Sequence, residues 1–225
     1  MGLLLLAAGL IALSAYAAQR SQASWRTYAA AGAYAALMAW LYSQTGVQMF
    51  TGGGEERFLA YFFVALLLGL LAESLAQLGQ GRLAAGLPPL TALLYALGLD
   101  VFRPDAYAYI PAAIVAVLVM ALAIQAFRRF SAGQGLAKWM LATQVAAYGL
   151  LLYAAVFKQI DRTWPLAESY LLDAGAFLFV AATLWHGWEQ VFGERRVPAW
   201  AQVAAGLLGQ GAIVVAAFVH YSVFL

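Results

Sequence analysis

The sequence contains no cysteine, and only 10% of its 225 residues are charged. The missing cysteines exclude disulfides, thiolate metal ligands and thiol nucleophiles together. A soluble domain has about 25% charged residues and roughly 45 to 50% apolar ones, whereas 65% of this chain is hydrophobic. Its formal net charge is +2, and the charges cluster near the ends of apolar runs. We therefore expect a membrane protein that does not bind nucleic acid.

The apolar runs predict an all-α fold. Lipid offers the backbone no hydrogen-bond partners, so a span must be a helix or part of a closed barrel, and these alanine- and leucine-rich runs lack the alternation of barrel strands. We expect a polytopic transmembrane helical bundle, one integral membrane domain over residues 1–225. Eight spans are expected, with seven as the alternative count: 2–18, 27–43, 58–78, 83–99, 107–127, 136–157, 165–188 and 198–222.

Lysines and arginines in the short loops predict the orientation of the bundle. The loops after the odd-numbered spans hold eight of these residues, and the other loops hold four. Since basic residues favour the cytoplasmic side, we expect both termini to lie outside the cytoplasm, in a bacterial inner membrane. The eight are Arg20, Arg26, Arg82, Arg128, Arg129, Lys138, Arg195 and Arg196, and the four are Arg57, Arg103, Lys158 and Arg162.

A carboxylate interrupts the third expected span, in the stretch LGLLAESLAQLGQ. Glu73, Gln77 and Gln80 are spaced i, i+4 and i+7, which places them on one helical face. An acidic side chain within a membrane span needs a partner, a cavity or a proton. Glu73 either extends toward Arg82 and the interface, or it faces the bundle interior, where it could transfer protons.

The seventh expected span carries a second polar set. Thr183, His186 and Gln190 fall within about 60° of one another at 100° per residue, while Asp173 projects from another sector near the outer end. Asp173 is either a partner inside the bundle or a group that reaches water. His186 either takes part in chemistry or donates to a nearby carbonyl. Glutamines elsewhere are expected to join helices by hydrogen bonds: Gln144, Gln202 and Gln210.

No metal site or cofactor is expected. The two histidines, His186 and His220, belong to opposite membrane faces in this topology, and no set of His, Asp and Glu residues has ligand spacing. Retinal is disfavoured as well. The stretch LLDAGAFLF is superficially similar to the retinal-binding helix of microbial rhodopsins, but an apolar residue stands where those proteins have their Schiff-base lysine.

Three stretches of the sequence carry a resemblance to a known family. AYFFVALLLGLLAESLAQ, GAFLFVAATLWHGWEQVF and GLLGQGAIVVA resemble motifs of the YhhN family of eight-span membrane proteins, whose characterised members are lysoplasmalogenases. Ala72 and Glu73 stand at the family's Gly-Asp pair, and Ala182 and Thr183 stand at its Ser-Asp pair. The first family carboxylate is thus kept as Glu73, and the second is replaced by Thr183.

The resemblance implies hydrolysis of the vinyl-ether bond of a lysolipid. Two carboxylates suit this reaction, because one protonates the alkene carbon while the other activates water. Here Glu73 is expected as the acid, with His186 or the more distant Asp173 in the second role. Thr183, Gln77, Gln190 and Gln210 are expected to contact the substrate, and Arg82 or Arg195 to meet its phosphate.

Two other functions stay open. The replaced carboxylate fits a catalytically inactive relative that binds a lipid or a partner membrane subunit, or that assembles as a homo-oligomer. Proton-coupled transport would also use Glu73, although the sequence shows no paired broken helices.

Overall fold

All regular structure in the described part of the chain is helical. The computed structural model describes residues 25–78, 80–101, 113–115, 117–118, 121, 135–192 and 198–222. It contains six long helices and, between α2 and α4, the short helix α3 (Gln48–Thr51) and the 3-10 turn η1 (Glu55–Arg57). The expected all-α fold is confirmed. The long helices are α2 (Trp25–Thr45), α4 (Phe58–Gln77), α5 (Gly81–Gly98), α7 (Gly135–Phe157), α8 (Leu166–Phe192) and α9 (Ala199–Ser222).

Six of the expected spans correspond to these six helices. Their predicted limits agree with the observed ones to within a few residues, and the largest difference is at α8, which continues to Phe192. The expected spans 2–18 and, apart from a few residues, 107–127 lie outside the described residues.

Three helices are long and apolar enough to cross a membrane. They are Phe58–Ala76, Leu166–Trp185 and Trp200–Ser222, with mean hydropathies of 2.1, 1.3 and 1.8. Two shorter apolar helices, Gly86–Gly98 and Ala142–Phe157, accompany them. These lengths and compositions are those of an integral membrane protein.

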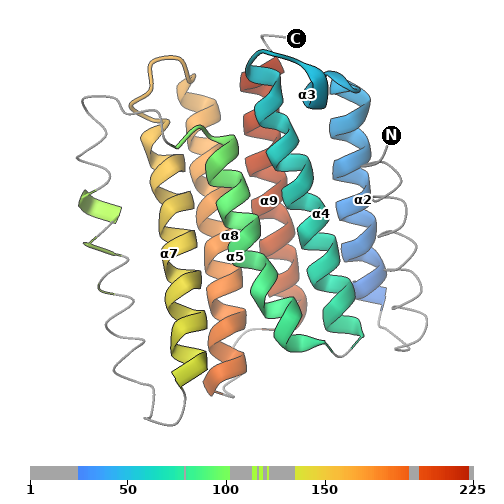
Figure 1. Ribbon diagram of the computed structural model, residues 1–225, viewed down its shortest axis with the longest axis vertical. Coiled ribbons are helices and arrows are strands. Elements are labelled where there is room, and N and C mark those ends of the chain that lie inside the picture. The colour runs from blue at the N-terminus through green and yellow to red at the C-terminus, as the bar shows by residue number, and fades with distance from the viewer. Residues whose placement is uncertain are drawn as a thin grey trace.

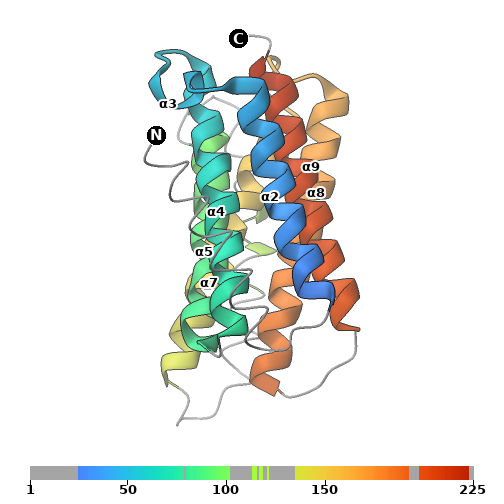
Figure 2. The ribbon, with the colours of Figure 1, turned by 90° about the vertical axis from the view of Figure 1, so that its right-hand side faces the viewer.

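The six long helices form a ring. Each packs against the next in the order α2, α4, α5, α7, α8 and α9, and α9 closes the ring on α2. Figures 1 and 2 show the helices running side by side along the long axis of the molecule, with α3 at the end where α4 begins. Aromatic and aliphatic side chains fill the interior toward that end, among them Phe62, Tyr95, Phe179 and Ile213.

Glycines bring α8 and α9 into backbone contact. A Cβ atom on Gly209 would lie 2.5 Å from the Phe179 nitrogen and 2.7 Å from the Gly175 carbonyl oxygen. A Cβ atom on Gly175 would lie 2.7 Å from the Gly209 carbonyl oxygen. Small residues allow membrane helices to approach in this way. Ala205, another small residue, lies four positions before Gly209 on α9.

Two adjacent prolines lie inside α5, which continues through them. A proline has no N–H group, so Pro88 cannot bond the carbonyl of Ala84 one turn earlier. Such a helix is stable where neighbouring groups or a polar cavity satisfy the freed carbonyl. Pro88 and Ala84 both line the cavity described below.

Replacing Gly209 with alanine is expected to destabilise the protein by about 1 to 3 kcal/mol, because the added methyl group overlaps backbone atoms of α8 that cannot move aside. Thermal unfolding of the detergent-solubilised protein measures this. Gly211→Ala is the matched control on the same helix, since no described atom lies within 4 Å of the position that a Cβ atom would take there. Equal unfolding temperatures for the two variants would contradict the proposed backbone contact.

Candidate functional site

A partly open cavity of about 210 Å³ lies inside the ring. All six long helices contribute to its wall. It lies toward the end of the bundle where α4 ends and α5 and α9 begin. Its polar residues are Tyr34, Glu73, Thr91, Gln144, Tyr148, Thr183, Gln202 and Gln210.

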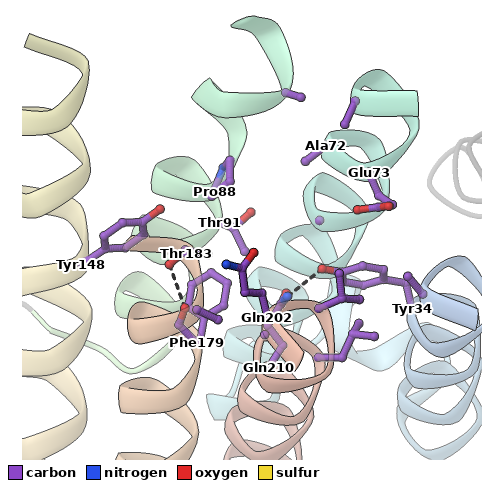
Figure 3. Close-up of a pocket in the computed structure, with 18 of the residues that line it drawn as sticks. Tyr34, Ala72, Glu73, Pro88, Thr91, Tyr148, Phe179, Thr183, Gln202 and Gln210 are labelled. Carbon is purple, nitrogen blue, oxygen red and sulfur yellow. Dashed lines mark hydrogen bonds between the residues drawn. The ribbon is translucent and has the colours of Figure 1, made fainter. Parts of the chain in front are cut away.

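Glu73 lines this cavity from α4 and is half-buried. It interacts electrostatically with Tyr34, which lines the same cavity from α2. Figure 3 shows Glu73 and Tyr34 on one side of the cavity and Tyr148 and Thr183 on the other. This is the inward position that the second interpretation of Glu73 predicted.

A chain of hydrogen bonds crosses the interior through Gln210. The Tyr95 hydroxyl donates to Gln210 Oε1 at 2.9 Å, and Gln210 Nε2 donates to the Tyr34 hydroxyl oxygen at 2.7 Å. Three helices, α5, α9 and α2, are joined in this way. The ring of Tyr34 fits because residue 69 is glycine, where a Cβ atom would come within 2.6 Å of it.

These bonds fix the direction in which protons are donated. Gln210 uses both ends of its amide group within the protein, so the prediction that it joins helices is confirmed. The Tyr34 oxygen accepts from Gln210, which leaves its own hydroxyl proton to donate. Glu73 is the charged group that acts on this hydroxyl. Gln210 thus positions Tyr34, and because one N–H group and one lone pair of its amide remain and it lines the cavity, its expected contact with a substrate stays a prediction.

Thr183 also lines the cavity, but its proton is used within α8. Its hydroxyl donates to the carbonyl oxygens of Phe179 at 2.7 Å and Val180 at 3.1 Å. Toward the cavity it therefore offers lone pairs and not a proton. The expected contact of Thr183 with a substrate stays a prediction, and in this arrangement such a contact would use the lone pairs of its oxygen.

Gln202 differs from the other glutamine of α9. Its side chain is 9% exposed and lines the cavity, and its Nε2 atom has no hydrogen-bond partner among the described residues. A buried donor left unpaired costs about 1 to 3 kcal/mol. The expected link from Gln202 to a neighbouring helix is thus not formed by this nitrogen, because no described acceptor reaches it.

Several predicted site residues lie elsewhere or have undescribed side chains. Asp173 is buried but is not among the residues that line the cavity; its carboxylate accepts a hydrogen bond from the Gln159 amide. The backbones of Gln77, Arg82, His186 and Gln190 belong to α4, α5 and α8, and their side chains fall outside the described set, as does Arg195 altogether. The sequence interpretation did not select Tyr34 or Thr91; it placed Tyr148 on one helical face with Gln144, and both line the cavity.

A second polar cluster lies at the opposite end of the bundle. Lys158 is 4% exposed and forms a salt bridge of 3.1 Å with Asp161 in the loop between α7 and α8. The Lys158 ammonium also lies 5.5 Å from the ring centre of Trp164, on which His220 stacks at 4.1 Å. A small pocket of about 50 Å³ adjoins this cluster.

The electrostatics of Asp161 follow from these contacts. Partial burial acts to raise its pKa, but hydrogen bonds from the Thr163 hydroxyl and amide, together with the Lys158 ammonium, outweigh burial, so the pKa is lowered. The two Thr163 bonds measure 2.6 and 3.0 Å. The ionised form of Asp161 is therefore stabilised by the fold.

Within the described ranges, no group of three His, Cys, Asp or Glu residues is placed to hold a metal ion. His220 lies near the end of α9, whereas position 186 lies near the opposite end of the bundle on α8, as the sequence predicted. The cavity can therefore offer a carboxylate, hydroxyl groups and amides to a bound molecule.

Comparison of the chain with protein-family models, with curated proteins and with solved structures finds no match.

Replacing Gln210 with leucine is expected to lower the free energy of unfolding by about 2 kcal/mol, because the buried Tyr34 and Tyr95 hydroxyls lose their partner. Removing both hydroxyls as well, in Gln210→Leu with Tyr34→Phe and Tyr95→Phe, is expected to restore most of this stability. Chemical unfolding in mixed micelles compares the variants. A triple variant less stable than the single one would contradict the proposed bridge.

Replacing Asp161 with asparagine is expected to lower stability at neutral pH by about 1 kcal/mol, since the side chain is 23% exposed. The pKa of Asp161 is lowered in the fold. The carboxylate therefore contributes its full stabilisation above its unfolded pKa of about 3.9. That stabilisation is lost as the pH falls through the pKa of the folded protein. The difference between wild type and variant should therefore shrink below about pH 4. Arg162→Gln, an exposed neighbour, is the control. A difference independent of pH would count against this role.

Proposed function

We propose that this chain is a membrane-embedded hydrolase of the lysoplasmalogenase type, a divergent member of the YhhN family that cleaves the vinyl-ether bond of a lysolipid. The observation that supports it is the position of Glu73 at the wall of a cavity inside the bundle, beside Tyr34. A carboxyl group in a partly enclosed site, surrounded by hydroxyl and amide groups, suits proton transfer to a bound molecule.

The proposal includes an arrangement in the membrane. Eight spans would place both termini outside the cytoplasm of a bacterial inner membrane, with the cavity in the cytoplasmic half. The basic residues of the loops support this orientation. A single-chain lipid would then reach the cavity from the bilayer.

The reaction needs one proton donor and one water molecule. Glu73 donates its proton to the outer alkene carbon of the vinyl ether, and the adjacent carbon becomes an oxocarbenium ion. Water adds to that carbon and gives a proton to His186, one helical turn from Thr183 on α8. The resulting hemiacetal breaks into an aldehyde and the free hydroxyl of the lysolipid headpiece, as its own hydroxyl proton moves to the departing oxygen. The proton that His186 took from water then passes to Glu73 and restores both groups.

The described groups have distinct tasks in this scheme. The Gln210 bond holds Tyr34, whose hydroxyl keeps its own proton to donate and which interacts electrostatically with Glu73. Thr183 presents lone pairs that can orient the attacking water. Gln77 and Gln190 would extend the polar surface, Asp173 would be a distant alternative base, and Arg82 or Arg195 would hold the lipid phosphate at the mouth.

The second candidate is a catalytically inactive relative that binds a lipid or a partner subunit. The described cavity wall has one carboxylate, Glu73, and Thr183 stands where the family motif has its second. A site that keeps its shape but lacks one acid fits binding without turnover.

Aldehyde release from a lysoplasmalogen tests the two candidates. Purified protein is expected to release aldehyde, and Glu73→Gln is expected to lower kcat by about 100-fold or more, since general acid catalysis supplies about 10² to 10⁴ in rate. Glu55→Gln, at the opposite end of α4, is the control and should retain activity.

Undiminished aldehyde release by Glu73→Gln would show that Glu73 is not the general acid. No release at any pH, with the lipid still bound, would favour the inactive binder. Solute uptake that depends on both a proton gradient and Glu73 would instead support transport.

A further inference from the structure

Gln202 presents a buried amide N–H group to the cavity. Its side chain is nine-tenths buried, it lines the cavity wall, and Nε2 has no described hydrogen-bond partner. Figure 3 shows the Gln202 side chain between Tyr148 and Thr183 on one side and Tyr34 and Glu73 on the other. An unmatched buried donor destabilises a fold unless an acceptor reaches it. The geometry thus leaves a place at Nε2 for an acceptor atom, which a molecule bound in the cavity can supply in place of water.

The charge of the wall limits what that molecule can be. Glu73 is the only Asp, Glu, Lys, Arg or His among the described residues that line the cavity. Whenever Glu73 is ionised, an anionic group beside Gln202 would meet this carboxylate with no cation among the described wall residues to offset the repulsion. The acceptor that reaches Nε2 is therefore an uncharged oxygen, such as an ether or a hydroxyl.

The volume of the cavity limits the size of the bound unit. Sites for drug-sized ligands span about 300 to 1,000 Å³, and this cavity has about 210 Å³. It fits a small polar unit of a few heavy atoms and the first carbons of a chain. Ala30, Ala72 and Leu207 supply an apolar part of the wall against which such carbons can lie.

We infer that the cavity binds the uncharged glyceryl unit of a single-chain lipid, and that Gln202 Nε2 donates a hydrogen bond to one of its oxygens. Any charged group of the lipid stays outside the cavity. This inference deepens the proposed function and rests on it only for the identity of the lipid. Gln202 then acts as a residue that selects the substrate.

The binding of 1-O-hexadecylglycerol tests this inference. This probe is a saturated single-chain glyceryl ether, so it contains no vinyl-ether bond to hydrolyse. Gln202→Leu is expected to weaken binding about tenfold, the effect of one lost hydrogen bond. The unfolding temperature without the probe should stay the same or rise, because an unmatched buried donor has been removed.

Two further variants complete the experiment. Gln202→Glu keeps the shape but replaces the donor with oxygen, and the same weakening is expected. Gln44→Leu is the control, since Gln44 is exposed on α2 and its amide donates to Ser43 on the same helix; it should leave binding unchanged.

Unaltered binding by Gln202→Leu, or tighter binding of hexadecyl phosphate than of the glyceryl ether, would overturn the inference. A fall in unfolding temperature without a change in binding would show that Gln202 is only structural. Binding that depends on Gln202, together with no aldehyde release, would support the inference while the proposed hydrolysis fails. Aldehyde release together with binding that does not depend on Gln202 would support the proposed hydrolysis and overturn the inference about Gln202.

Discussion

The hydrogen-bond chain through Gln210 is the constraint on which the interior of this protein depends. A polar group at the centre of an apolar bundle is costly unless a partner or a water molecule reaches it. The two hydrogen bonds of Gln210 pair the polar groups of three helices, since they join Tyr95 of α5 and Tyr34 of α2 to α9. Their geometry leaves the Tyr34 hydroxyl proton to be donated. The position of Tyr34, and with it the surroundings of Glu73, follows from that chain.

The sequence predicted the helices well because their signal is local. Long apolar runs and the need for internal backbone hydrogen bonds determine where α2, α4, α5, α7, α8 and α9 lie, and even Pro88 and Pro89 did not mislead the prediction. The inward placement of Glu73 was also within reach, since a carboxylate on an apolar face has few alternatives.

The composition of the site was harder to predict, because it depends on which helices are neighbours. Tyr34 and Tyr148 have the composition of ordinary interior aromatics, and only the closure of the ring brings them to the same cavity as Glu73. Nor could the sequence distinguish the unpaired amide of Gln202 from the bridging amide of Gln210. Eight residues apart on one helix, they differ only in what α2 and α5 present to them. Gly32 and Gly209 likewise have similar small-residue spacing, yet only Gly209 touches a neighbouring backbone among the described atoms.

The ring is not equally stiff around its circumference. Where Gly175 and Gly209 place two backbones in contact, α8 and α9 behave as one unit, because sliding either would drive main-chain atoms together. On the far side, α5 carries two prolines and lacks part of its own hydrogen-bond ladder beside the cavity. Bending of the cavity wall would therefore fall on α5, and the double proline would decide how far that wall can move.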